Sequence, residues 1–221
     1  MKKLIIAITL LVGSVNFAQE LSESQLDFLC DFYKQGKYEE FAQLFTDRLL
    51  PEENKTDPKL IKSYIDVSTL KRNILLKKYC PEFTSSILRL SPFTDIVDMD
   101  NIFNKEELLL LKRQIIDIKN QGLNVFLVTV SDYFPYKTKE DFSYNFLLEN
   151  QNIFTKKGNL IILINLSNRE IRISTDDSAK SILKDNLIQN TIESMIIPYF
   201  KEEDYFRGIT NGLYNIYDLV K

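Results

Sequence analysis

The chain of 221 residues contains no histidine and no tryptophan. Without an imidazole group, Ser-His-Asp and Cys-His catalytic machinery and zinc sites with histidine ligands are excluded. Any catalysis would therefore depend on carboxylates, lysine, tyrosine, serine, threonine or a cation bound through oxygen atoms. No pattern for an organic cofactor is evident.

An excess of positive charge is also missing, because 28 basic residues stand against 31 acidic ones and the net charge is −3. This balance provides no electrostatic footprint for nucleic acid or anionic lipid, so no nucleic-acid partner is expected. The apolar run at residues 4–12 is too short to cross a bilayer, which needs roughly 20 residues. We expect no transmembrane segment in the mature chain.

The first residues have the pattern of a signal peptide. Lys2 and Lys3 form a basic start, the apolar run at 4–12 follows, and Ala18 is the expected last residue removed. The alternatives are an N-terminal anchor or a buried helix. A signal peptide at residues 1–18 predicts export, with a periplasmic or extracellular location for the mature protein.

Cysteine is scarce, since only Cys30 and Cys80 are present. In an oxidising compartment they could pair and close a loop of about 50 residues, which would stabilise the fold by roughly 3–4 kcal/mol through chain entropy. Two buried thiols are the alternative. Spacing alone does not fix the distance between the two Cα atoms, so both possibilities stay open.

Residues 19–85 have helical periodicity. A helical hairpin is expected around the break at residues 35–38, QGKY, and a further helix at residues 60–79. One helical pair cannot bury its own apolar face, so this segment is expected to pack on something else. It suggests a docking face for a protein partner.

Residues 93–221 change to alternating helices and strands. Expected strands cover residues 123–130, 159–165 and 169–174, the last two as an antiparallel hairpin. Expected helices cover residues 104–120, a segment opened by Thr138, and 178–184, 186–197 and 202–219. This order predicts an α/β fold, a small three-layer α/β/α sandwich, preceded by the helical segment.

Acidic residues gather in the stretch FTDIVDMDN at residues 93–101. The predicted topology places Asp98, Asp100, Asp132 and Asp185 near the carboxyl ends of the parallel strands, where open α/β sheets bind ligands. Oxygen donors without histidine or cysteine suit Ca²⁺ or Mg²⁺. The alternative is that these residues only complement helix N-termini.

Other acidic residues are assigned away from this candidate site. Asp95 is expected to lie in the approach segment and to face water. Asp176 and Asp177 should emerge at the opposite end of the sheet, as the N-cap of the helix that starts at Ser178.

Three stretches resemble the TPM domain family, over about residues 93–220. VDMDNIFNKEELLLL is similar to the opening of that domain, and GNLIILINLSNREIRIS is similar to its hairpin. The segment at 183–216, LKDNLIQNTIESMIIPYFKEEDYFRGITNGLYNI, resembles its closing pattern. That pattern is matched by Pro198, Phe200, Asp204, Tyr205, Gly208, Ile209 and Gly212.

The resemblance implies an exported α/β/α domain that is either an accessory module of the cell envelope, in some members with bound Ca²⁺, or an acid phosphatase. Asp98 and Asp185 match the family's two acidic positions. The chain departs from the pattern at Asp100 and Asn101, where the family has Ala-Gly, and in STDDSAK at 174–180, which lacks the usual glycines. These departures favour a binding module with a protein partner. The alternative is a metal-assisted phosphomonoester hydrolase using Asp98 and Asp185.

Overall fold

The computed structural model divides the chain into two compact units, Met1–Ile87 and Leu88–Lys221. It describes residues 30, 31, 34, 67, 69–71, 73, 74, 76–80, 83, 88, 95–150 and 156–221. The predicted signal peptide at 1–18 and most of the segment at 19–85 therefore lie outside the described residues.

In the first unit, Cys30 and Cys80 form a disulfide with their Cα atoms 5.4 Å apart. The question that spacing left open is thereby answered in favour of the bridge. A disulfide is compatible with an extracytoplasmic location, because the cytosol keeps such thiols reduced.

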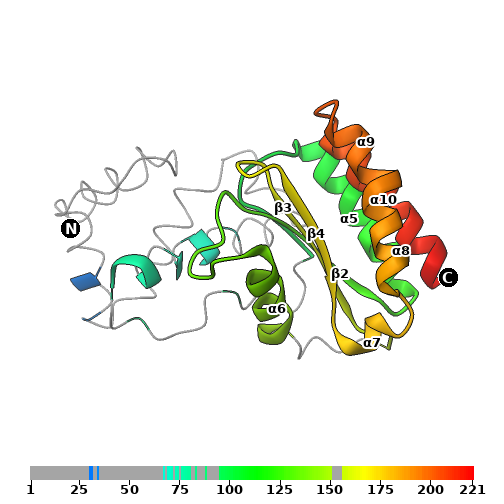
Figure 1. Cartoon of the computed structure of the whole chain (residues 1–221). Helices are drawn as coiled ribbons and strands as arrows, with labels where there is room; N and C mark the ends of the chain where they lie inside the picture. Colours follow the sequence, from blue (N-terminus) through cyan, green and yellow to red (C-terminus); the bar gives the residue numbers. More distant parts are fainter. Residues whose placement is uncertain are drawn as a thin grey trace. The chain divides into compact units, whose positions relative to one another are not determined.

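The second unit is built on a mixed sheet of four strands in the order β1-β2-β3-β4. Figure 1 labels β2, β3 and β4. The strands are β1 (Ile96–Asp98), β2 (Asn124–Thr129), β3 (Asn159–Asn165) and β4 (Glu170–Thr175). β1, β2 and β3 are parallel, and β4 is antiparallel to β3. Every residue of β2 and β3 is buried. This confirms the prediction, made from their continuous apolar runs, that both strands are covered on both faces.

β1 was not expected from the sequence. Its three residues, IVD, are too few to show a strand period, and only pairing with β2 extends them. Ile96 lies beside Leu127, and Asp98 lies beside Thr129. This pairing brings the acidic stretch into the sheet.

Helices cover both faces of this sheet. α6 (Lys139–Glu149) lies on one face, and α5 (Lys105–Asn120) with α10 (Tyr205–Val220) lies on the other (Figure 1). The edge-to-face rings of Phe126 and Phe146, 5.3 Å apart, join β2 to α6. The predicted α/β class is confirmed as a four-stranded mixed sheet packed by helices.

Helix ends follow the local signals in the sequence. Asn104 and Glu107 form the predicted capping box at the start of α5, and Thr138 caps α6 by accepting from the Asp141 N–H. Gly122 follows α5 with φ +97°, a conformation that favours glycine. Asp176 caps the short helix α7 (Asp177–Lys180), as predicted.

The helix predicted to end before Pro198 instead continues through it. α8 (Asp185–Asn190), the π-helical turn η2 (Thr191–Ile196) and α9 (Ile197–Phe200) follow one another without a break. Pro198 is tolerated because it occupies the first turn of α9, where a missing N–H costs little. The prediction of a stop at Pro198 was wrong because it treated proline only as a breaker.

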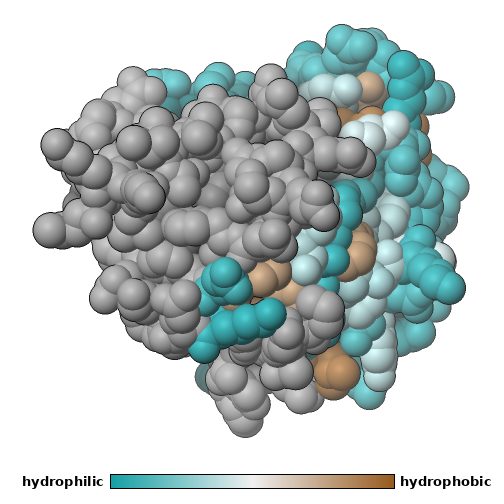
Figure 2. Space-filling model, turned by 90° about the vertical axis from the view of Figure 1, so that its left-hand side faces the viewer, coloured by the Kyte–Doolittle hydropathy of each residue, from teal (hydrophilic) through white to brown (hydrophobic). Residues whose placement is uncertain are grey.

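None of the helices in the described part of the chain combines the length and the apolar character needed to cross a bilayer. Where Figure 2 shows described residues, hydrophilic side chains predominate and hydrophobic ones form small separate patches. The large exposed apolar residues of the described chain are Leu110, Ile116, Tyr144, Leu148 and Tyr214. They are spread over three helices.

Candidate functional site

Asp98 ends β1 with its carboxylate turned into the protein, where only 7% of the residue is exposed. Its Oδ1 accepts hydrogen bonds from the Ile102 N–H (3.1 Å) and the Thr129 hydroxyl (2.8 Å). Its Oδ2 accepts from the Phe103 N–H (3.0 Å). Asp98 therefore fastens the turn that leads from β1 into α5.

The electrostatic environment of Asp98 opposes its negative charge. Burial raises the pKa of this carboxyl above its ordinary value of 3.8, and the nearby negative charge of Asp100 raises it further. The three hydrogen bonds from Phe103, Thr129 and Ile102 lower the pKa but do not offset the burial. An ionised Asp98 thus carries a cost that a neighbouring cation would reduce.

Asp100 lies in the same cluster as Asp98, through two residues at the end of β2. The Thr129 hydroxyl oxygen accepts from the Asp100 N–H (3.1 Å) while the same hydroxyl donates to Asp98. The Ser131 hydroxyl donates to Asp100 Oδ1 (2.6 Å). The parallel register of β1 and β2 creates this contact, since Asp98 lies beside Thr129.

Asp132 and Asp185, the other two predicted ligands, have different surroundings. Asp132 is exposed directly after Ser131, and its Oδ1 accepts from the Phe134 N–H (2.9 Å). Asp185 is in the first turn of α8, where its exposed side chain lies 3.6 Å from Lys180, and it lines a groove along β4. β4 and the strand of Asp98 are at opposite edges of the sheet.

The structure thus brings Asp98 and Asp100 together and places Asp132 next along the same loop, but it puts Asp185 elsewhere. Within the residues that the structure describes, no three side chains of the Asp, Glu, Cys or His types lie close enough to share a metal ion.

Asp95 was expected to face water, but it is buried, with only 4% of the residue exposed. Lys119 Nζ lies 3.1 Å from its Oδ1, and its carbonyl oxygen accepts from the Leu127 N–H at 2.8 Å. The prediction was wrong because the Asp95 carbonyl, one residue before β1, already bonds to β2, and Lys119 of α5 lies against its carboxylate. A carboxylate so placed joins α5 to the sheet.

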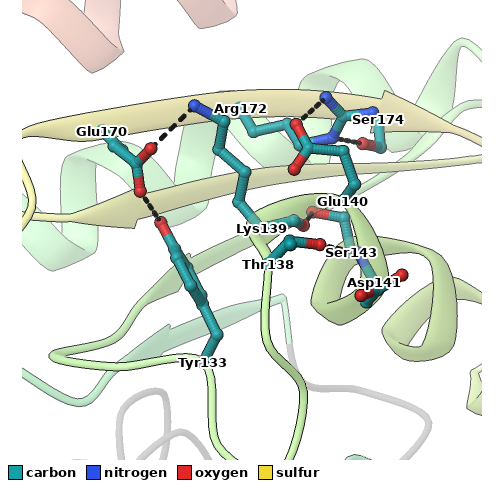
Figure 3. A network of polar contacts seen from close by, with 9 residues as sticks. All are labelled: Tyr133, Thr138, Lys139, Glu140, Asp141, Ser143, Glu170, Arg172 and Ser174. Carbon is teal, nitrogen blue, oxygen red and sulfur yellow. Dashed lines mark hydrogen bonds and ion pairs between the residues drawn. The ribbon is translucent and has the colours of Figure 1, made fainter.

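A second polar cluster at the same end of the sheet was not predicted (Figure 3). Glu170, at the start of β4, accepts from the Tyr133 hydroxyl (2.7 Å) and from Lys139 Nζ (3.0 Å). Arg172 donates to Glu140 (2.9 Å) and to the Ser174 hydroxyl (2.8 Å). The alternation of Glu170, Arg172 and Ser174 along one face of β4 was a signal that could have pointed to this cluster.

Two tyrosines in the loop before α6 are weaker acids than usual. Burial and the carboxylate of Glu170 raise the pKa of Tyr133 far above its usual value. Burial and the charge of Glu149 raise the pKa of Tyr136 to about 12. Both hydroxyls are therefore hydrogen-bond donors at neutral pH and not bases, so the two tyrosines organise the loop before α6.

Comparison with known proteins shows the family to which the chain is similar. The family model described as TPM domain matches residues 96–219. No curated protein matches the chain. Among solved structures, the N-terminal domain of a P. gingivalis protein, determined by NMR, is 18% identical with a TM-score of 0.51; the match covers 64% of this chain and 90% of that one.

A second solved structure, the NMR structure of the BA42 protein from the psychrophilic bacterium Bizionia argentinensis, is 14% identical with a TM-score of 0.46. That match covers 55% of this chain and 83% of the other. The structural likeness to the P. gingivalis domain supports the fold, and the family match extends over more than half of the chain. The chain belongs to the TPM domain family.

Proposed function

We propose that this TPM-domain protein is exported and acts as an accessory module of the cell envelope that binds a protein partner. We further propose that a divalent cation such as Ca²⁺ or Mg²⁺ binds at Asp98 and Asp100. The observation that carries the choice of a module over an enzyme is the engagement of the Asp98 carboxylate by the Ile102, Phe103 and Thr129 donors.

A carboxylate held in this way is poorly suited to general-base or nucleophilic chemistry. Proton transfer requires a free lone pair aimed at the substrate. A carboxylate accepts about four hydrogen bonds, and Asp98 uses three of these positions for the turn after β1. The described residues around Asp98 supply hydroxyl and amide groups from Thr129, Ile102 and Phe103, and none of these is a base.

The donor set fits a hard cation in its chemistry. One acceptor position of Asp98 stays open, and the carboxylate of Asp100 and the Ser131 hydroxyl offer further oxygen atoms. Ca²⁺ accepts such mixed oxygen ligands and completes its shell with water. A cation there would supply the positive charge that offsets the two neighbouring carboxylates.

Metal-assisted phosphatase chemistry, the alternative, draws less support from the geometry. It would use Asp98 and Asp185 together, but Asp98 ends β1 at one edge of the sheet, and Asp185 of α8 lines the groove along β4, the strand at the other edge. The four strands span about 14 Å, which is three strand spacings. The segment at 174–180 that lacks the family's glycines forms the end of β4 and the capped helix α7. It offers no glycine-rich backbone loop for phosphate.

Calorimetric titration of metal-free protein with Ca²⁺ and Mg²⁺ tests the cation. We expect saturable binding that Asp100→Asn weakens by about tenfold or more, as loss of one charged ligand predicts. Asp185→Asn is the matched control and should bind like the parent protein. Absence of binding by the parent, or equal losses in the two variants, would reject the cation site.

Two further assays separate the module from the enzyme. Affinity capture from envelope extract with the full chain should retain a protein partner. The same preparation should release no phosphate from a generic phosphomonoester with Ca²⁺ or Mg²⁺ present. Phosphate release that disappears in Asp98→Asn would establish the enzyme instead.

A further inference from the structure

The outer edge of β4 carries backbone groups that the sheet does not use. The carbonyl oxygens of Gly158 and Ile164 accept hydrogen bonds from the N–H groups of Asn124, the first residue of β2, and Val130, the residue after β2. The backbone N–H and C=O groups of the even-numbered residues of β3 therefore point to β2, and those of the odd-numbered residues point to β4. In an antiparallel pair, hydrogen-bonded and non-hydrogen-bonded positions alternate. The register pairs Ile161 with Ser174 and Leu163 with Arg172, which makes these the hydrogen-bonded pairs.

Ile171, Ile173 and Thr175 consequently point their N–H and C=O groups away from β3. The bond from the Asp176 N–H to the Asn159 carbonyl continues the same alternation. No other segment among the described residues bonds to these six backbone groups. A row of this kind is a template for an additional strand.

A groove of about 670 Å³ runs along this edge. One wall is apolar and comes from the segment α8-η2-α9, with half-buried Ile188, Ile192 and Ile197 opposite Ile171 and Ile173 of β4. The π-helical turn η2 contributes Ile192 to this wall. The groove therefore combines backbone groups that no described segment pairs with and a surface for apolar side chains.

Positive charge predominates in the groove, although the whole chain is acidic. Its lining contains four cationic residues against two carboxylates: Lys139, Arg169, Arg172 and Lys180 against Glu170 and Asp185. The exposed Arg169 guanidinium, at one end of β4, has no ion-pair or hydrogen-bond partner among the described residues. Just beyond the other end, the Lys180 ammonium group has, among the described residues, only the long, exposed contact to Asp185 at 3.6 Å.

We propose that an extended acidic segment of a partner protein adds to β4 as a fifth strand of the sheet. This inference rests on the proposed role as a binding module and names the class of partner segment. Main-chain hydrogen bonds to Ile171, Ile173 and Thr175 supply affinity, and the two walls select the side chains. Alternate residues of the segment are apolar, toward η2, and acidic, toward Lys139 and Arg172 (Figure 3).

A synthetic peptide that alternates aspartate with valine, labelled for fluorescence anisotropy, tests the proposal on the full chain. We expect saturable binding, and at least about tenfold weaker binding of the peptide that alternates lysine with valine. No saturable binding of the aspartate peptide, or equal binding of both, overturns the proposal.

N-methylation of the peptide tests strand addition itself. Along a strand, successive amide hydrogens point to opposite sides, so only one alternate set can bond to β4. Methylating the amides of one residue type should abolish binding, and methylating those of the other type should leave it intact. The sensitive set depends on the strand direction. Equal effects of the two methylations would reject a fifth strand.

Charge reversal at the ends of β4 provides the protein-side test. The double variant Arg169→Asp with Lys180→Glu should weaken binding of the aspartate peptide by at least about tenfold. Aspartate is chosen at position 169 because it tolerates the left-handed backbone of that residue, whose φ is 54°. The matched control, Arg113→Glu with Lys201→Glu, changes charge equally at exposed positions outside the groove and should bind normally.

The remaining outcomes are equally informative. Equal weakening in both double variants would show attraction by net charge alone and overturn the site. If sedimentation shows that the parent protein is a dimer and that the double variant Arg169→Asp with Lys180→Glu is a monomer, the edge of β4 would be assigned to a second copy of the chain. A partner captured unchanged by that variant would reject this groove while leaving the module function in place.

Discussion

Asp98 has both a structural role, in the turn after β1, and a proposed chemical role, as a ligand of a cation. The sequence selected it by topology and by resemblance, and the structure shows that its carboxylate holds the turn after β1. Which groups would contact it was not foreseeable, because Thr129 lies far away in sequence and joins it only through strand register. Asp100 was identified as a neighbour because local spacing alone brings it near.

The pKa of Asp98 gives a prediction at this scale. Since the folded state raises this pKa, the carboxyl favours folding at pH below 3.8, and that contribution is lost as pH rises through the raised value. A titration followed by carboxyl ¹³C NMR should show a pKa above 3.8. In Asp100→Asn the value should fall, because the charge of Asp100 is one cause of the increase.

Asp132→Asn is the control for that titration, since Asp132 is not among the charges that shift Asp98. An Asp98 pKa that responds equally to both substitutions, or that lies below 3.8, would contradict the environment described for this carboxyl.

At the scale of elements, helix ends were predictable and short segments were not. Asn104, Thr138 and Asp176 cap their helices through contacts within three residues, which a local sequence pattern records. β1 and the turn η2 depend on distant partners, namely β2 for the first and α10 for the second. No local period identifies them.

The glycines of the closing pattern explain how α10 packs. A Cβ on Gly208 would lie 2.8 Å from two atoms of the Phe200 ring and 3.1 Å from the Ile196 carbonyl oxygen. A Cβ on Gly212 would lie 2.7 Å from Ile196 Cδ1. These glycines let α10 approach the segment η2-α9 closely, so their positions in the motif have a packing reason.

Gly208→Ala should therefore destabilise the second unit by about 1–3 kcal/mol, because overpacking exceeds the gain of roughly 1 kcal/mol in helix propensity. Denaturant unfolding measures the change. Tyr214→Ala, on the exposed side of the same helix, is the control and should have a much smaller effect. A more stable Gly208→Ala protein would show that the segment opposite can retreat.

At the scale of the whole molecule, the disulfide and the sheet belong to different units. Replacing both Cys30 and Cys80 by alanine should cost the first unit about 3–4 kcal/mol, because a loop of 50 residues is no longer closed in the unfolded chain. Hydrogen exchange followed by mass spectrometry should show faster exchange in peptides from residues 67–80 than in the parent protein.

Peptides that cover β2 and β3 serve as the internal control for this double substitution. Their amides should keep the parent's protection, since the buried sheet is built within residues 88–221 alone. An equal loss of protection in the sheet would show that the two units unfold together.

The sequence by itself determined the exclusion of histidine chemistry, the α/β class, the helix caps and the family, because each depends on composition or on contacts between near neighbours. Only the tertiary structure decided that Asp95 is buried, that Asp185 lines the groove along β4 and not the edge where Asp98 lies, and that Cys30 pairs with Cys80. The same holds for the outer edge of β4, with which no segment of the described residues pairs. Strand order and register bring distant residues together, and no local pattern records the free energy of that pairing.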